Sequence, residues 1–132
     1  MVLGYRDPAE VIDQNFPVWL TTGRRLQSYH TRTQTGRASG IDYLLSEESV
    51  EVNPADLLDW GLRDGCWVRL TSRRGSVEIK VRATDRSPRG TVFASFSFAD
   101  VPVNNLTGSG YDPTTHTAEL KVCAVRIEAV ER

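Results

Sequence analysis

The sequence predicts a small, mainly β domain whose strands close into a barrel. Six short runs of β-forming residues are separated by turn signals, and this spacing is typical of barrels. One segment carries clear start and stop signals for a short helix, whereas two long polar segments, 23–40 and 99–118, show no regular period. With 132 residues, of which 39% are hydrophobic, the chain is large enough for one core.

The chain divides into a polar N-terminal arm, residues 1–15, and a predicted barrel domain, residues 16–130. Residues 17–22 are rich in β-formers and predict a buried strand that Gly23 ends. Residues 49–53 alternate between polar and apolar side chains, which indicates a second strand.

The predicted helix follows this second strand directly. Asn53 is a suitable N-cap, and Pro54 suits the first helical position because its missing N–H would be unpaired there anyway. Residues 55–60 then supply two turns, and Gly61 is a suitable helix terminator.

Four further strands are predicted after the helix: 67–71, 76–84, 91–98 and 119–130. The apolar residues of 76–84 alternate strictly, as in a strand with one buried face. In the last strand the apolar residues change parity between Ala124 and Val125. This change predicts either a β-bulge or burial on both faces.

Charge is unevenly distributed although the net charge is only −1. Segment 23–40 holds four arginines and no acid, and residues 41–60 hold six acids and no base. Arginine outnumbers lysine 14 to 2, which fits either phosphate and carboxylate recognition or a GC-rich genome. The weak net charge and the lack of an exposed aromatic ladder argue against a nucleic-acid partner.

No known catalytic template is present: the chain lacks G-x-S-x-G, H-E-x-x-H and the phosphate-binding P-loop. Cys66 and Cys123 belong to no C-x-x-C pair and lie in apolar runs, which is typical of buried structural thiols. No signal peptide or membrane-length apolar stretch is found. We therefore expect a cytoplasmic protein without a membrane partner.

Two basic turns are candidates for phosphate binding. Residues 21–25, TTGRR, place a glycine, hydroxyls and arginine forks at a strand end, where they can hold a diphosphate or form an ordinary surface turn. The second turn, residues 72–75, is more typical of a solvated hairpin turn than of a phosphate site.

Several motifs in this order resemble the molybdopterin dinucleotide-binding domain of the formate dehydrogenase and nitrate reductase family. The resemblance covers roughly residues 16–128. It rests on TGRRLQSYHT (22–31), VNPAD (52–56), GLRDG (61–65), SRRG (72–75), NNLT (104–107), DP (112–113) and KVCAVRI (121–127).

The resemblance implies a double-psi β-barrel, with one or two short helices, that binds molybdopterin guanine dinucleotide carrying Mo or W. The residues that it implies for cofactor binding are Thr22, Gly23, Arg24, Arg25, Tyr29, His30, Thr31, Phe96, Asn104 and Lys121. His30 either donates to a pterin or packs at the base of its loop.

The family's metal ligand and iron–sulfur cysteines lie in other domains, and neither cysteine here occupies their positions. The chain is therefore expected not to be catalytic alone. It would serve as the C-terminal domain or a split subunit of a Mo/W oxidoreductase, most like formate dehydrogenase, with a larger catalytic chain as partner. The alternative is a non-catalytic barrel that serves in assembly or cofactor carriage.

Overall fold

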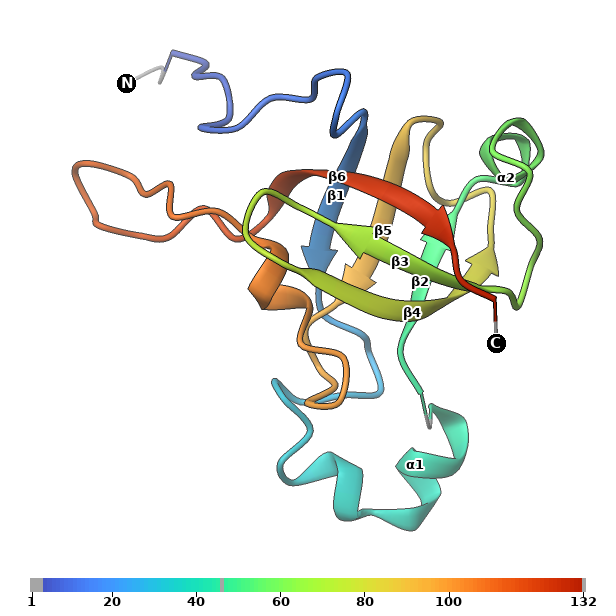
Figure 1. Cartoon of the computed structure of the whole chain (residues 1–132). Coiled ribbons are helices and arrows are strands. Elements are labelled where there is room, and N and C mark those ends of the chain that lie inside the picture. The colour runs from blue at the N-terminus through green and yellow to red at the C-terminus, as the bar shows by residue number, and fades with distance from the viewer. Residues whose placement is uncertain (1–3, 46, 132) are drawn as a thin grey trace.

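A computed structural model describes residues 4–45 and 47–131 and shows a β-barrel with long connections at one end (Figure 1). Its strands are β1 (Val18–Gly23), β2 (Ser49–Val52), β3 (Trp67–Thr71), β4 (Ser76–Ala83), β5 (Thr91–Ser95) and β6 (Val122–Ala129). Each overlaps a predicted strand. The last two are shorter than predicted, because the chain leaves the sheet after Ser95 and rejoins it only at Val122.

The strands close in the order β1-β5-β2-β4-β3-β6. Strand β1 is parallel to β5, and β2 is parallel to β4, whereas the other neighbours are antiparallel. Exchanging β1, β2 and β3 with β4, β5 and β6 converts every pairing into another pairing of the same barrel. This internal two-fold relation confirms the expected double-psi barrel.

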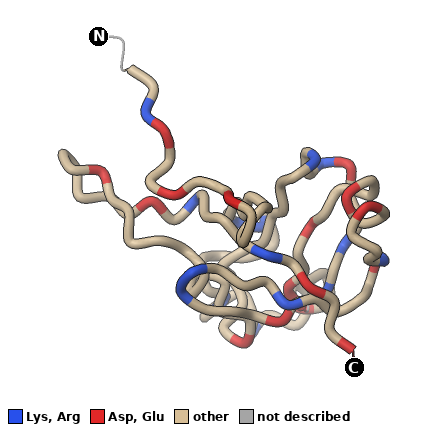
Figure 2. Tube along the Cα trace, turned by 45° about the horizontal axis from the view of Figure 1, so that its top comes forward, with Lys and Arg blue, Asp and Glu red and all other residues tan. Residues whose placement is uncertain are grey.

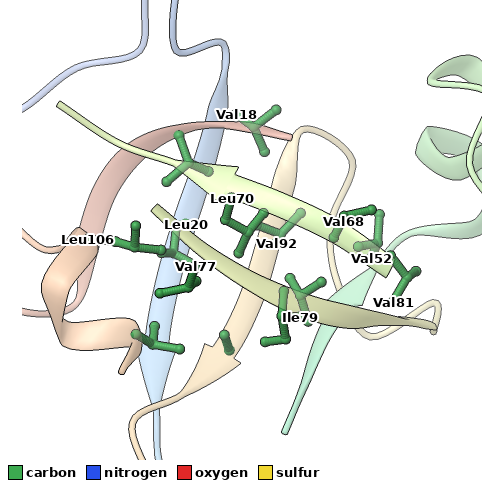
Figure 3. Packing of buried hydrophobic residues seen from close by; sticks show 14 of the residues in the cluster. Val18, Leu20, Val52, Val68, Leu70, Val77, Ile79, Val81, Val92 and Leu106 are labelled. Carbon is green, nitrogen blue, oxygen red and sulfur yellow. The ribbon is translucent and has the colours of Figure 1, made fainter. Parts of the chain in front are cut away.

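Aliphatic side chains from all six strands and from the 3-10 turn η2 (Val103–Leu106) fill the barrel (Figure 3). Paired residues of neighbouring strands face the same side of a sheet. Leu20 therefore meets Val92 inside the barrel, and Leu70 meets Val77. Full burial of each such side chain contributes about 1.5–3 kcal/mol, so the interior is the main source of stability.

Strand β6 is buried on both faces. Its register against β1 and β3 is continuous, so the predicted bulge is wrong and the alternative of two-sided burial is right. Cys123 and Val125 lie opposite Leu20 and Val18 and face the interior. Ala124 faces outward and is nevertheless fully buried, and its N–H donates to Glu10 of the N-terminal arm.

Helix α2 (Pro54–Asp59) begins and ends as predicted. The side chain of Asn53 accepts a hydrogen bond from the N–H of Ala55 at 3.0 Å, so it caps the first turn. Gly61 has a φ of 66°, a left-handed conformation that favours glycine and stops the helix.

Helix α1 (Ser39–Leu44) was not predicted. It follows a 3-10 turn, η1 (Thr35–Arg37), at the end of the segment expected to lack regular structure. None of its six residues is buried, and its N-cap makes no side-chain hydrogen bond, so neither periodicity nor a cap marks it in the sequence. No helix in the described part of the chain has the length and apolarity needed to cross a membrane.

The N-terminal arm is held against the barrel by ion pairs. The Glu10 carboxylate lies 2.7 Å from Arg73 and 2.6 Å from Arg74, and it accepts the N–H of Ala124 at 2.9 Å. Asp13 forms a second ion pair with Arg73. The arginines of the SRRG turn therefore bind carboxylates of the arm, which supports the hairpin-turn interpretation over a phosphate site.

Acid is expected to release this contact. Burial of the Glu10 carboxyl raises its pKa, but the hydrogen bonds from Arg74 and Ala124 and the charge of Arg74 outweigh burial and lower the pKa below its ordinary 4.5. A lowered folded-state pKa contributes stability above the unfolded pKa and loses it as pH falls through the folded value. Glu10→Gln should therefore reduce the free energy of unfolding by about 1–3 kcal/mol at neutral pH.

The difference between Glu10→Gln and the wild type should shrink as pH falls below 4.5, as measured by urea unfolding across the acid range. Glu128→Gln is the matched control, because Glu128 forms an exposed pair with Arg126 worth about 1 kcal/mol or less. A Glu10→Gln effect that persists undiminished in acid would contradict this account.

Candidate functional site

The two long connections leave the barrel at the same end. Because β1 and β5 are parallel, with Gly23 opposite Ser95, the chain departs from both strands in one direction. Strand β6 is antiparallel to β1 and is entered from that end: the N–H of Thr22 donates to the carbonyl of Lys121 at 3.2 Å. Both segments that the sequence analysis singled out, 23–40 and 99–118, therefore extend from this end (Figure 1).

Three of the predicted site residues are brought together here. The Thr22 hydroxyl donates to the carbonyl of Leu120, which anchors the chain just before Lys121. The Lys121 Nζ lies 5.7 Å from the centroid of the Phe96 ring. Lys121 is exposed, so its ammonium group is available to an anion while the aromatic ring restricts its position.

A close approach favours glycine at position 23. A Cβ placed on it would lie 2.7 Å from Cε2 of Phe93, closer than such atoms approach one another in proteins. Because it has no side chain, Gly23 lets the backbone lie close to the Phe93 ring. Gly23 lies near the start of segment 22–31, which the family resemblance implies for cofactor binding. The predicted importance of this position therefore has a steric reason.

The neighbouring arginines, Arg24 and Arg25, have different environments. Arg24 is exposed. The Arg25 guanidinium lies within 3.0 Å of Glu48 and 2.9 Å of Glu51, and it donates to the carbonyl of Ser49 at 2.9 Å. The Arg25 N–H groups are thus bound to groups of the protein itself, as expected of a residue that positions the segment after β1.

Glu48 is the centre of this buried network. Its side chain has no exposed surface, and it also accepts hydrogen bonds from the hydroxyl and N–H of Ser95. The basic segment and the acidic segment of the sequence are therefore joined through ion pairs, as is also seen for Arg32 and Asp42 at 2.5 Å. Figure 2 shows where the basic and acidic positions lie on the folded trace.

The remaining predicted residues are exposed and loosely arranged. Tyr29 and His30 contact edge to face, with ring centroids 4.7 Å apart, and His30 has a φ of 46°. Thr31 is exposed in the same loop. Asn104 lies exposed on η2, and no hydrogen bond within the described residues joins its side chain to the others.

Three buried side-chain atoms in the described part of the chain lack a hydrogen-bond partner: Ser28 Oγ, Arg32 Nε and Ser97 Oγ. Ser28 and Arg32 belong to segment 23–40, and Ser97 lies just after β5, before segment 99–118. Buried donors without partners are costly, so their concentration here suits a site completed by an oxygen-rich ligand. The resemblance assigned no individual role to these side chains, and nothing in the sequence distinguishes Ser97 from other serines.

The described residues contain no group of three or more His, Cys, Asp or Glu side chains that could hold a metal ion. Burial raises the pKa of the Cys123 thiol to about 11. Cys66, which is partly exposed, is also a free thiol.

Comparison with known families and proteins gives consistent matches. A model of the family described as "Molydopterin dinucleotide binding domain" matches residues 18–124. The F420-dependent formate dehydrogenase 2 subunit alpha of Methanococcus maripaludis is 40% identical over 126 residues. The F420-dependent formate dehydrogenase subunit alpha of Methanocaldococcus jannaschii is 39% identical over 126 residues.

These two matches cover 96% of this chain but only 19% of each relative. Among solved structures, acetylene hydratase from Pelobacter acetylenicus superposes with a TM-score of 0.79 at 14% identity, over 94% of this chain and 20% of that chain. At this identity the likeness shows the fold alone. The chain spans about a fifth of the length of these proteins.

Proposed function

Because the chain belongs to the molydopterin dinucleotide binding domain family, we propose that it forms one wall of a molybdopterin guanine dinucleotide site in a larger Mo/W oxidoreductase. The observation that carries this proposal is the placement of all three unpartnered buried polar atoms beside the predicted binding residues. An oxygen-rich dinucleotide can supply the acceptors that these donors lack.

The proposed roles follow from what each side chain offers. Arg24 and Lys121 are exposed cations suited to phosphate oxygens. Phe96 and Tyr29 offer aromatic surface, and Gly23 permits close approach of the backbone. Thr22 anchors the chain just before Lys121 through its hydroxyl, while Thr31 contributes a hydroxyl, Asn104 an amide and His30 a ring N–H.

Arg25 is proposed to position the loop, because its guanidinium is already bound to Glu48 and Glu51. When bound, the cofactor would supply the Mo or W ion and its redox chemistry. The residues of this chain bind and orient it.

The proposal requires a larger chain with the metal ligand and iron–sulfur domains. Leu26 is 98% exposed and Tyr43 is 89% exposed, and such a partner would cover them. The short span relative to full-length relatives supports it further. We place the assembly in the cytoplasm, where free thiols such as Cys66 and Cys123 are usual.

Co-purification tests the cofactor proposal. The chain is expressed with its genomic neighbours, and guanine nucleotide released by acid hydrolysis is quantified together with Mo and W. Arg24→Ala and Lys121→Ala should each lower cofactor retention about tenfold, because each removes a charge-assisted contact to phosphate. Arg126→Ala, which removes an exposed arginine paired with Glu128, should leave retention unchanged.

Retention that is the same in all three variants would contradict the assignment of Arg24 and Lys121. A wild-type chain that binds its partner but retains no pterin dinucleotide would instead favour a non-catalytic barrel that serves in assembly.

A further inference from the structure

The turn between β3 and β4 carries two adjacent arginines that bind different parts of the chain. Arg73 donates to Glu10 at 2.7 Å and also pairs with Asp13, both of which belong to the N-terminal arm. Its guanidinium carbon lies 4.8 Å from the centroid of the Phe16 ring. Within the described residues, the Arg73 side chain thus binds groups that precede β1, whereas Arg74 binds the arm and one further element.

Arg74 joins the arm to the turn η2. Its Nη1 lies 2.6 Å from the Glu10 carboxylate. Its Nε and Nη2 both donate to the carbonyl of Leu106, at 3.0 Å and 2.8 Å. Leu106 is the last residue of η2, and the last carbonyls of a helix have no partner inside it. The guanidinium therefore supplies two donors to a carbonyl that the turn itself does not pair.

Turn η2 carries Asn104, one of the residues that the resemblance implies for cofactor binding. Val103 and Leu106 are fully buried in the barrel, whereas Asn104 is exposed. A 3-10 turn of this length is held by few hydrogen bonds of its own. A Cβ on Gly75 would lie 3.5 Å from the carbonyl oxygen of Asn105, so the arginine-bearing turn lies directly against η2 and can restrain it.

The arm contacts the same connection at a second point. The N–H of Ala9 donates to the Glu119 carboxylate at 3.0 Å. A Cβ on Gly110 would lie 2.7 Å from Cβ of Ala9, so glycine there lets the arm lie close. Residues of the arm and of the connection also line a cavity of about 640 Å³. A few polar bonds, more than dense packing, therefore hold the two segments together.

We propose that Arg74 is a positioning residue: it fixes turn η2, and with it the exposed Asn104, while Glu10 of the arm fixes Arg74. The position of the arm is thereby transmitted to the wall of the cofactor site. This last step rests on the proposed function, which makes Asn104 a binding residue. The resemblance assigned no role to Glu10 or Arg74.

Backbone order parameters of the 132-residue chain, measured by NMR relaxation, test the restraint. The N–H groups of residues 105–107 should have values of about 0.85 in the wild type, and Arg74→Gln should lower them to about 0.6. Arg73→Gln is the matched control, because Arg73 binds the same carboxylate but not η2, and it should leave them unchanged. Order parameters describe the folded chain, so a loss of overall stability does not lower them.

Two further variants test the route through the arm, also in case Arg74→Gln does not fold. Glu10→Gln should lower the order parameters of η2 partway, and it should have no further effect when added to Arg74→Gln. Gly110→Ala should also lower them, because the new methyl group displaces Ala9 while both partners of the ion pair stay intact. Gly40→Ala should change nothing, since a Cβ there has no atom within 4 Å.

Cofactor retention in the assembled complex tests the link to the site. Arg74→Gln and Asn104→Ala should each lower retention of pterin dinucleotide about tenfold. The double variant should lose no more than Asn104→Ala alone, because both substitutions remove the same contact. Arg73→Gln should retain as much as the wild type. Independent, additive losses would show that Arg74 acts through overall stability and would overturn the positioning role.

Unchanged order parameters of η2 in Arg74→Gln would overturn the proposal, as would equal decreases in Arg74→Gln and Arg73→Gln. If the wild-type complex retains pterin dinucleotide and Arg74→Gln retains as much, the positioning role fails and the proposed function stands. If the wild-type complex binds its partner but retains no dinucleotide, the proposed function fails, and the order parameters alone decide whether Arg74 positions η2.

Discussion

Arg25→Ala is expected to reduce the free energy of unfolding by about 3–5 kcal/mol, because it leaves a buried carboxylate without its main cationic partner. The Glu48 side chain has no exposed surface, and Arg25 bridges it to Glu51. Ser95 and Ser49 still donate to Glu48, but neither carries a charge. Urea unfolding of both proteins measures the difference.

Arg24→Ala is the matched control, since it removes an adjacent, exposed arginine and should change stability by about 0.5 kcal/mol or less. Adding Glu48→Gln to Arg25→Ala should recover part of the loss, because the unpaired charge is then gone. If Arg25→Ala were as stable as Arg24→Ala while cofactor retention fell, Arg25 would be a direct ligand of the cofactor, as the family resemblance implies, and the positioning role would be wrong.

Leu20→Ala is expected to have an effect of similar size, about 2–5 kcal/mol, by opening a cavity in the barrel interior. Leu20 is fully buried, and in β1 it pairs with Val92 on one side and Cys123 on the other. Chemical denaturation should show a lower midpoint with an unchanged slope, since the surface exposed on unfolding stays the same.

The control for this substitution is Leu58→Ala. Leu58 is 81% exposed on α2, and alanine is a better helix former than leucine, so stability should change little. A Leu20→Ala loss no larger than that of Leu58→Ala would mean that β1 is not part of the cooperative core.

From the sequence, residues of the candidate site could be proposed only where they lie in a short motif. Residues 22–31 resemble a motif of the family, and the binding roles of Gly23 and Arg24 stay a prediction. Arg25 and Arg32 look alike in the sequence, yet one is bound by two carboxylates and the other keeps an unpartnered donor. Their partners come from residues 42–51 and from Phe98, and no spacing rule within the loop predicts these contacts.

Helix α1 and strand β6 are two further features that the sequence alone did not predict fully. The exposed helix has no apolar face to produce a period. The change of parity in β6 allows two interpretations, and the continuous register of β6 against β1 and β3 decides between them. In both cases the deciding contact lies outside the segment.

The sequence by itself determined the six strands, helix α2 with its Asn53 cap, and the family, because alternation, capping and turn residues act within a few positions of the chain. Only the tertiary structure decided which donors of the described residues are paired within the protein and which are not. The parallel pairing of β1 with β5 brings two connections to one end of the barrel. There Arg25 is bound by two carboxylates, whereas Arg32 Nε and Ser97 Oγ have no hydrogen-bond partner among the described residues. The free energy of those contacts depends on distance and burial in three dimensions, which the order of residues in one loop does not specify.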